Sequence, residues 1–304
     1  MALDAEALLD RRRQRRRLVF WRVAAVLAVA FALVAGLARF DGLFGLGGPH
    51  IARLWVTDII VDDQQRTDTI DELTDSDDVD AVVVRIDSPG GTLSGSEELY
   101  LALRRLAERK PLVAVIGGVG ASGGYMAAIA AERIFAREST ITGSIGVILQ
   151  TMEVTELLAK LGIKPEAIKS SPLKAQPSPF ETMSDAARAA TVATVADSHA
   201  LFVSMVGARR GLEGEALAAV TDGRVFTGRQ ALDVKLIDAI GGEREAVAWL
   251  AEAHDIDPDL PVRDVDWRKP GEMLSELGSW VFGKPYSFER LTLDGLVALW
   301  HPRR

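Results

Sequence analysis

The sequence of 304 residues has no cysteine, only four histidines and an aromatic content of 6%. Without cysteine there are no disulfide bonds, thiolate metal sites or cysteine nucleophiles. An HExxH motif and a Walker glycine loop are missing too, so we expect no metal ion and no organic cofactor. Basic residues are not in excess, because 35 Lys and Arg face 43 Asp and Glu, for a net charge of −8. This balance argues against a general nucleic-acid-binding protein.

One long apolar run is present, at residues 18–38, and only Arg22 interrupts it. As a helix this run spans roughly 30 Å, which matches the hydrocarbon core of a bilayer. Six arginines lie just before it, at residues 11–17, and such residues mark the cytoplasmic side. The sequence therefore predicts a basic cytoplasmic tail at residues 1–17, a transmembrane helix at 18–38 and an exported remainder. A cleaved signal peptide is the alternative, but the Ala-x-Ala at residues 30–32 falls inside the run.

A glycine-rich linker at residues 39–50 leads into a region where short apolar runs alternate with helical patterns. The alternation predicts an α/β fold with a parallel sheet over residues 51–255. We expect a helix at 94–110, capped by Ser94 or Ser96, and a long helix at 184–209. The predicted strands are 51–56, 81–86, 112–116, 133–136, 147–150 and 167–170.

The remaining residues, 256–304, form a C-terminal extension with a less decisive pattern. We expect a strand at 262–265, a helix at 271–282 and an amphipathic end at 291–300. This amphipathic end could pack on the core of its own chain or dock on a neighbouring protomer, and the sequence fits both.

The segment GASGGY, residues 120–125, follows an apolar strand and opens a helix of small residues. A serine at such a turn faces a substrate, and small neighbours let a substrate backbone approach. Backbone N–H groups at the start of the helix can stabilise a developing oxyanion. Ser122 is therefore the candidate nucleophile. The alternative is a turn whose glycines only let strand and helix pack closely.

A second glycine-rich turn, DSPGG at residues 87–91, follows the predicted strand 81–86. It can supply another oxyanion donor, or it can be a tight strand-to-helix turn and nothing more. Because the carboxyl ends of parallel strands share one edge of a sheet, we expect this turn beside Ser122.

A serine nucleophile needs a base, and the sequence offers two kinds. Asp238 with His254, or Asp185 with His199, would complete a histidine triad, but neither histidine has the loop context of a mobile base. Lys174 lies in the proline-rich segment SPLKAQPSPF, with few charges nearby in sequence. A lysine acts as a base only as the neutral amine, and apolar surroundings favour that form. An ordinary exposed lysine is the alternative.

Together these motifs resemble the signal peptide peptidase A family of bacterial serine peptidases, also called protease IV. The resemblance covers residues 51–250 and rests on DSPGG, GASGGY, TGSIGV, KSSPLKAQPSPF and VFTGRQALDVKLIDAIGG, in this order. It implies a Clp/crotonase-like α/β domain of stacked β-β-α units. It also implies that a chain of this length assembles into a homo-oligomeric ring, in which serine and lysine can come from neighbouring protomers.

The resemblance implies a role for each site residue. Ser122 would be the nucleophile and Lys174 the general base, with Ser144 orienting the lysine amine. The backbone N–H groups of Gly91 and Gly123 would form the oxyanion hole. The family often has an aromatic residue before the lysine and a polar one after it, whereas this sequence has Leu173 and Ala175. Lys169 is the competing lysine that a test has to control for.

The resemblance therefore implies a membrane-anchored serine endopeptidase with a Ser/Lys dyad. It would lie in the bacterial inner membrane, with its catalytic domain on the periplasmic or outer side. Its substrates would be apolar, membrane-derived peptides such as signal-peptide remnants. Two other classes remain open, a crotonase-fold enzyme that acts on acyl-CoA and a non-catalytic membrane-associated ring scaffold.

Overall fold

The computed structural model describes Arg17, residues 20–29, Phe31, residues 48–265, Trp267 and residues 297–299. The chain divides into two compact units, Met1–Gly48 and Pro49–Arg304. In the first unit Phe20–Val29 is an apolar helix with mostly exposed side chains. It overlaps the predicted membrane span at 18–38, which stays a prediction.

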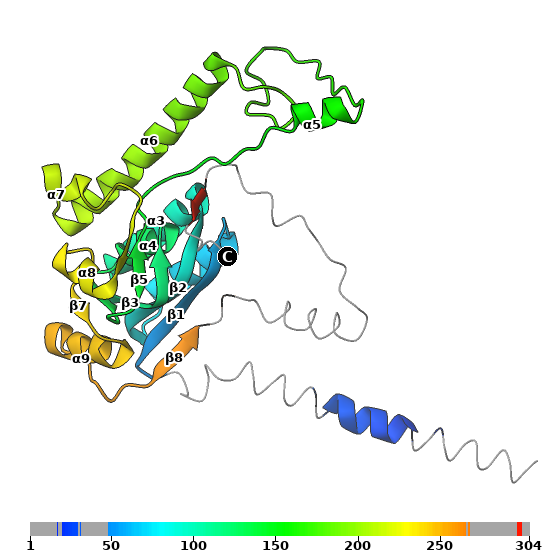
Figure 1. Ribbon diagram of the computed structural model, residues 1–304. Coiled ribbons are helices and arrows are strands. Elements are labelled where there is room, and N and C mark those ends of the chain that lie inside the picture. The colour runs from blue at the N-terminus through cyan, green and yellow to red at the C-terminus, as the bar shows by residue number, and fades with distance from the viewer. Residues whose placement is uncertain are drawn as a thin grey trace, which may run out of the picture. The chain divides into compact units, whose positions relative to one another are not determined.

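The second unit is built on a mainly parallel sheet, which confirms the expected α/β class (Figure 1). Its main path runs in the order β6-β5-β3-β2-β1-β8. Three further strands lie off this path: β4 pairs with β3 and β7, and β9 pairs with β2. The strands are β1 (His50–Ile60), β2 (Val79–Thr92), β3 (Leu112–Ala121), β4 (Arg133–Ala136), β5 (Ile141–Gly143), β6 (Val225–Thr227), β7 (Ala239–Ile240), β8 (Val262–Val265) and β9 (Val297–Leu299).

The three central strands are apolar on both faces because both faces are covered. Val82, Val84 and Ile116 belong to the larger core, together with side chains of α3, α4 and α6. Val83 and Val113 belong to a smaller core on which α9 packs. The helices are α2 (Gln64–Asp75), α3 (Leu93–Ala107), α4 (Gly123–Ala128), α5 (Thr155–Lys160), α6 (Asp185–Arg210), α7 (Gly214–Ala218), α8 (Gly228–Asp233) and α9 (Glu243–His254).

Helix α3 begins slightly earlier than expected. Its N-cap is Thr92, whose hydroxyl oxygen accepts a hydrogen bond from Gly95 N at 3.2 Å. The prediction of Ser94 or Ser96 as the cap was therefore wrong. Ser96 instead donates its hydroxyl to the carbonyl of Thr92 at 2.7 Å, inside the first turn.

Two predicted strands are absent. Residues 147–150 form only an isolated bridge at Ile148, and residues 167–170 form no strand at all. Ile168 is 98% exposed, so the apolar residues of this region are not buried against a sheet of the same chain. Residues 150–183, which we call the arm, contain α5, and no residue of α5 is buried. Figure 1 shows the arm extending away from the sheet.

Among the described residues, α6 is the one helix long and apolar enough to cross a membrane by length and composition. The C-terminal part of α6 is nevertheless a component of the sheet domain. Phe202 and Val206 are fully buried. Arg209 donates to the carbonyls of Ile129 and Ala131 at 2.8 and 2.9 Å.

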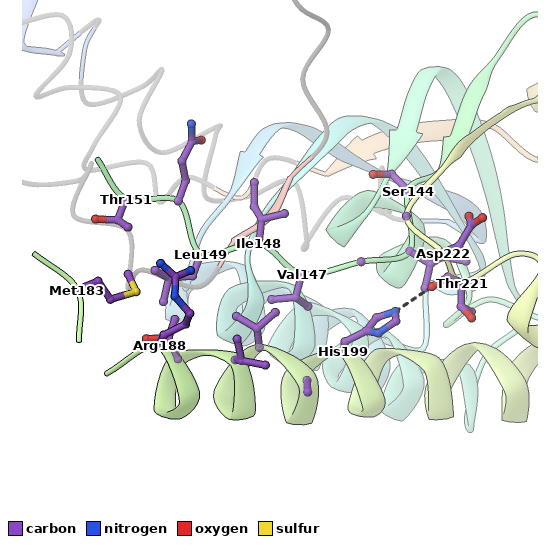
Figure 2. A pocket seen from close by; sticks show the side chains of 18 residues that line it. Ser144, Val147, Ile148, Leu149, Thr151, Met183, Arg188, His199, Thr221 and Asp222 are labelled. Atoms are coloured by element: carbon purple, nitrogen blue, oxygen red, sulfur yellow. Dashed lines mark hydrogen bonds between the residues drawn. The ribbon is translucent and has the colours of Figure 1, made fainter. Parts of the chain in front are cut away.

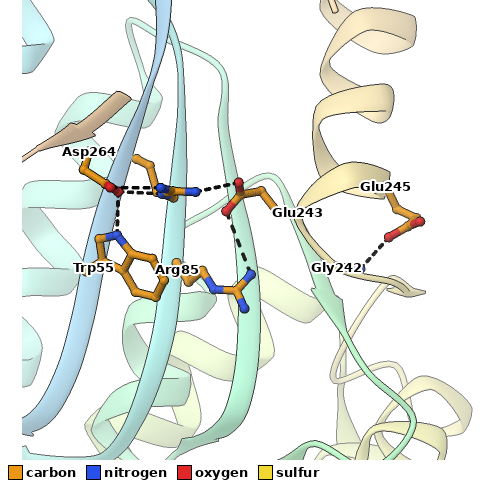
Figure 3. A network of polar contacts seen from close by, with 7 residues as sticks. Trp55, Arg85, Gly242, Glu243, Glu245 and Asp264 are labelled. Atoms are coloured by element: carbon orange, nitrogen blue, oxygen red, sulfur yellow. Dashed lines mark hydrogen bonds and ion pairs between the residues drawn. The ribbon is translucent and has the colours of Figure 1, made fainter. Parts of the chain in front are cut away.

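A polar network joins the edge strand β8 and helix α9 to the centre of the sheet (Figure 3). Arg53 of β1 donates to Asp264 of β8 at 2.6 and 2.9 Å and to Glu243 of α9 at 2.8 Å. Trp55 Nε1 donates to the same Asp264 carboxylate at 2.6 Å. The guanidinium of Arg85, on β2, lies over the Trp55 ring, 5.4 Å from its centre. The strand predicted at 262–265 is thus confirmed, whereas the helix predicted at 271–282 lies outside the described residues.

Candidate active site

Ser122 lies between the end of β3 and the start of α4. Its backbone has φ 54° and ψ −117°, a combination that residues with a side chain rarely adopt. Ser122 N donates to the carbonyl of Gly143 at 2.8 Å, and the carbonyl of Ser122 accepts from Met126 N at 2.9 Å. The side chain makes no capping hydrogen bond to α4. The turn therefore has the geometry of a nucleophile at a sharp strand-to-helix corner.

The glycines after Ser122 are required by close packing. A Cβ atom on Gly124 would lie 2.6 Å from the carbonyl oxygen of Ser88. A Cβ atom on Gly123 would lie 2.2 Å from Ser96 Oγ. The start of α4 is thus pressed against the end of β2 and the first turn of α3, which brings the two glycine-rich turns together as expected.

The backbone nitrogen of Gly91 lies next to the start of α4. The position that a Cβ on Gly123 would take is 3.2 Å from Gly91 N. Gly91 itself has no room for a side chain, because a Cβ would lie 1.7 Å from the carbonyl oxygen of Ile60. The two residues expected to form the oxyanion hole are therefore neighbours across the gap between β2 and α4.

Ser88 and Asp87 hold the turn that precedes Gly91. Ser88 Oγ donates to the carbonyl of Asp58 at 2.5 Å and accepts from Gly90 N at 3.1 Å. Asp87 Oδ1 accepts from Val119 N on β3 at 3.0 Å. Sequence reasoning treated these two side chains only as parts of a motif, because their partners lie about 30 residues away.

Ser144 is placed beside Ser122 by the register of two parallel strands. Ala121, the last residue of β3, pairs with Gly143, the last residue of β5, and each strand is followed directly by a serine. Ser144 is half-buried, has a positive φ of 51°, and its N–H donates to the carbonyl of Arg224 at 2.8 Å. The backbones of the two serines therefore lie side by side.

Lys174 lies on the arm and is exposed, with its N–H donating to the carbonyl of Ser171 at 3.1 Å. Within the described part of the chain, no hydrogen bond or ion pair joins its side chain to Ser122 or Ser144. The competing Lys169 is paired with Glu181 at 2.5 Å, and its side chain is only 15% exposed. A single copy of the chain therefore does not assemble the predicted dyad, and the role of Lys174 stays a prediction.

The histidine alternatives do not form triads. Asp238 accepts two hydrogen bonds from Arg210, at 2.7 and 3.1 Å, and a third from Ile134 N at 2.8 Å. His254 lies 2.9 Å from Glu132 instead. His199 Nε2 is hydrogen-bonded to the carbonyl of Thr221 at 2.9 Å. Asp185, its candidate partner, is four turns away on the same helix at about 1.5 Å per residue, which places it roughly 20 Å distant.

A cavity of about 840 Å³ opens between α6 and the segment that follows β5. Figure 2 shows Ser144 at one end and Met183 at the other, with Val147 and Ile148 between them. Val192 of α6 lines the opposite wall and is 61% exposed. Sequence reasoning missed this cavity, although the apolar residues of α6 recur with helical spacing. Among the described residues, no group of three or more His, Asp or Glu side chains could hold a metal ion.

Comparisons with known proteins show the family of the chain. The sequence profile of peptidase family S49 matches residues 104–257. A candidate protease of Synechocystis sp. is 42% identical over 179 residues, 59% of this chain and 65% of that protein. A candidate signal peptide peptidase SppA of Enterococcus faecium is 32% identical over 170 residues, 56% of this chain and 49% of that protein. The chain thus spans about half to two-thirds of these relatives.

Among solved structures, a point mutant of ClpP1 from Listeria monocytogenes is similar, with a TM-score of 0.41 and 16% sequence identity. The similarity covers 64% of this chain and 92% of that one. The family profile spans half of the chain and includes the serine turn, Ser144 and Lys174. The chain therefore belongs to peptidase family S49, a family of serine peptidases.

Proposed function

We propose that the chain is a membrane-anchored serine endopeptidase that acts through an acyl-enzyme on Ser122. The observation that carries the proposal is the strained turn of Ser122, with Gly91 N beside the start of α4 and Ser144 directly after the neighbouring strand β5. Backbone strain at a strand-to-helix corner of this kind is typical of nucleophiles. Family membership supports the same reaction class.

In the proposed reaction, Ser122 Oγ attacks the substrate carbonyl while the neutral amine of Lys174 accepts the hydroxyl proton. The N–H groups of Gly91 and Gly123 stabilise the oxyanion. Collapse of the intermediate breaks the C–N bond, and the lysine returns the proton to the leaving amine. A water molecule then attacks the acyl-enzyme and gives a proton to the lysine. The lysine passes this proton to Ser122 Oγ as the ester C–O bond breaks, which releases the carboxylic acid and the free serine.

The lysine that serves Ser122 is proposed to come from a neighbouring copy of the chain. Lys174 lies on an arm that extends away from the sheet (Figure 1). The arm exposes large apolar side chains that a solitary chain would leave in water, among them Leu161 at 65% and Ile168 at 98%. The cavity beside Ser144 offers a place where an arm can dock. Such an arrangement requires a homo-oligomer, in keeping with the expected ring.

The proposed substrates are apolar peptides at the outer face of the bacterial inner membrane. The predicted membrane span at 18–38 would hold the catalytic domain next to the bilayer, where signal-peptide remnants are found. A relative from Enterococcus faecium whose name refers to signal peptide peptidase activity supports this substrate class.

The test is complementation between two inactive variants of the full chain in detergent micelles. Ser122→Ala and Lys174→Ala are each expected to lose hydrolysis of an apolar fluorogenic peptide, whereas Lys169→Ala and His199→Ala are expected to keep it. Co-expression of Ser122→Ala with Lys174→Ala creates interfaces that join an intact serine to an intact lysine. For random assembly of a head-to-tail ring we expect about a quarter of the wild-type activity.

The outcomes separate the parts of the proposal. Hydrolysis by Ser122→Ala at the wild-type rate would refute the serine mechanism. Complete inactivity of the co-expressed variants, with both singles inactive, would show that the dyad forms within one chain. Loss in His199→Ala with full activity in Lys174→Ala would point to a histidine base instead.

A further inference from the structure

Two arginines bind the backbone at the C-terminal end of α4. Arg209 of α6 donates to the carbonyls of Ile129 and Ala131 at 2.8 and 2.9 Å. Arg104 of α3 donates to the carbonyl between them, that of Ala130, at 2.9 Å. The three residues that offer these carbonyls are buried. The arginines therefore satisfy carbonyl groups that water would satisfy at an exposed helix end.

This arrangement of charges is unfavourable apart from its bonds to α4. Both arginines are half-buried, and within the described residues neither forms an ion pair with a carboxylate. Burial, and then the nearby charge of Arg104, lower the pKa of Arg209. Cations are nevertheless favoured at the C-terminal end of a helix by the helix dipole. The contacts with the end of α4 are therefore what offsets the cost of placing the two cations together.

Helix α4 has only six residues, so its position depends on its contacts with the rest of the domain. At its start, Gly123 and Gly124 are packed so closely that neither has room for a Cβ atom. In its middle, the buried Tyr125 donates its hydroxyl to the carbonyl of Leu236 at 2.8 Å. The arginines fix the other end, and the direction of the helix axis is set by both ends together.

The direction of α4 matters because the proposed oxyanion hole has its donors on two separate parts of the fold. Gly91 lies on β2, within the sheet, whereas Gly123 is the first residue of α4. Two N–H groups stabilise an oxyanion together only when both point at it. The helix spans about 9 Å from Gly123 to Ile129, so a shift at the arginine end tilts the axis and turns the Gly123 N–H away.

We propose that Arg104 and Arg209 are positioning residues, which aim the Gly123 N–H at the oxyanion by holding the C-terminal end of α4. The proposal rests on the proposed function, since it needs an oxyanion at this place. The carbonyls that the arginines hold begin about 9 Å along the helix from Gly123, so the arginines act through α4 and not by contact with a substrate. Loss of either arginine weakens stabilisation of the transition state and leaves binding of the substrate unchanged.

The first experiment replaces each arginine by methionine in the full chain in detergent micelles. Methionine keeps a long apolar side chain but has no N–H to donate. For Arg104→Met and Arg209→Met we expect kcat for an apolar fluorogenic peptide to fall about tenfold to hundredfold at unchanged KM, less than the loss caused by removing an oxyanion donor outright. Arg105→Met, the next residue on α3, is the matched control and is expected to behave as wild type, because Arg105 pairs with Asp71 at the surface.

Lysine variants provide a graded rescue and keep the test open if a methionine variant does not fold. Arg104 serves one carbonyl, which a lysine amine can also reach, so Arg104→Lys is expected to recover most of the activity. Arg209 holds two carbonyls with its fork of N–H groups. Arg209→Lys is therefore expected to have a kcat between those of wild type and Arg209→Met.

A pair of inhibitors separates stabilisation of the oxyanion from binding. With a peptide aldehyde, Ser122 Oγ bonds to the carbonyl carbon, the hydroxyl proton passes to Lys174, and the carbonyl electron pair moves to the oxygen in the hole. The matched peptide alcohol cannot form this adduct. In the methionine variants we expect Ki of the aldehyde to rise by the factor by which kcat/KM falls, and Ki of the alcohol to stay unchanged.

The proposal is overturned by an unchanged kcat in both methionine variants, or by equal weakening of the aldehyde and the alcohol. Hydrogen exchange of residues 120–128 provides a readout that needs no catalysis, and we expect it to be faster in the methionine variants than in Arg105→Met. Unchanged exchange would also overturn the proposal. If wild type hydrolyses nothing and the exchange is faster, the proposed function fails and the fixing of α4 by the arginines stands.

Discussion

The backbone of Ser122, at φ 54° and ψ −117°, lies in a region that glycine occupies far more readily than a residue with a Cβ atom. Such positions carry strain on the order of 1–3 kcal/mol, which the surrounding hydrogen bonds must offset. The bonds from Ser122 N to Gly143 and from Met126 N to Ser122 are placed to do this. The strain points to a serine that is kept for its chemistry at a cost in stability.

We therefore expect Ser122→Gly to unfold at a higher denaturant concentration than Ser122→Ala, although both variants are expected to be inactive. Strain relief of about 1–3 kcal/mol exceeds the entropy that glycine adds to the unfolded chain, about 0.4–1 kcal/mol. The difference is measured by urea unfolding of the full chain in micelles, followed by circular dichroism. Ser139, exposed and without a positive φ, is the matched control, and there alanine is expected to be the more stable. If the alanine variant is more stable than the glycine variant at position 122 as well as at position 139, Ser122 is not strained.

At the scale of elements, the carboxylate of Asp264 joins the edge strand β8 to β1 through hydrogen bonds from Arg53 and Trp55. Hydrogen bonds from Arg53, and then from Trp55, lower the pKa of Asp264 to about 2. An aspartate in the unfolded chain titrates near pH 3.9. Because the folded pKa is the lower one, the ionised Asp264 stabilises the fold fully above about pH 5, and this contribution is lost as the pH falls towards 2.

The matching prediction concerns Asp264→Asn, which removes the charge at every pH. We expect the variant to be less stable than wild type at pH 6, and the gap between the two to narrow steadily from about pH 4 to pH 2. The stability difference between wild type and variant is measured from the midpoints of urea unfolding at a series of pH values. Asp77→Asn, at an exposed turn, is the control. A gap that stays constant with pH would mean that Asp264 acts through packing and not through its charge.

Strands were predicted correctly from the sequence where the residues of an apolar run are buried in the core of the same chain. The strands before DSPGG and GASGGY were recognised from short apolar runs, and both are buried as expected. The strands predicted at 147–150 and 167–170 were wrong. In the first segment only Val147 is buried, whereas Ile148 is 46% exposed, and in the second segment Ile168 is 98% exposed. In sequence, exposed apolar residues look the same as those of a core.

The candidate site was predictable only in part, for a related reason. Ser122 and Gly91 could be predicted because each lies in a local glycine-rich motif. The glycine at position 91 is required because close packing leaves no room there for a side chain. The position of Ser144 depends on the register of β5 against β3, which no local pattern encodes. The pairing of β9 with β2 joins residues about 200 positions apart, and a three-residue strand has too weak a pattern to reveal it.

At the scale of the whole molecule, the arm and the sheet domain differ in how far they bury their apolar side chains. The sheet domain buries its apolar residues in two cores, whereas the arm leaves Leu157, Leu161, Ile163 and Ile168 more than half exposed. Full burial of one such side chain is worth about 1.5–3 kcal/mol. Folding of a single chain does not bury these side chains, so it does not gain this free energy. Association of chains through the arm would bury them.

Ile168→Glu is therefore expected to weaken assembly without unfolding the chain. Losing one buried isoleucine at each interface corresponds to about a tenfold to hundredfold weaker association. Native mass spectrometry in detergent, over a dilution series, measures the oligomer, and peptide hydrolysis is expected to fall with it because Lys174 is supplied by the arm. The control is Ala216→Glu on α7, which is exposed and lies at the end of α6 remote from the arm (Figure 1). If Ile168→Glu assembles and hydrolyses peptide as wild type does, the arm is not the surface that joins the chains.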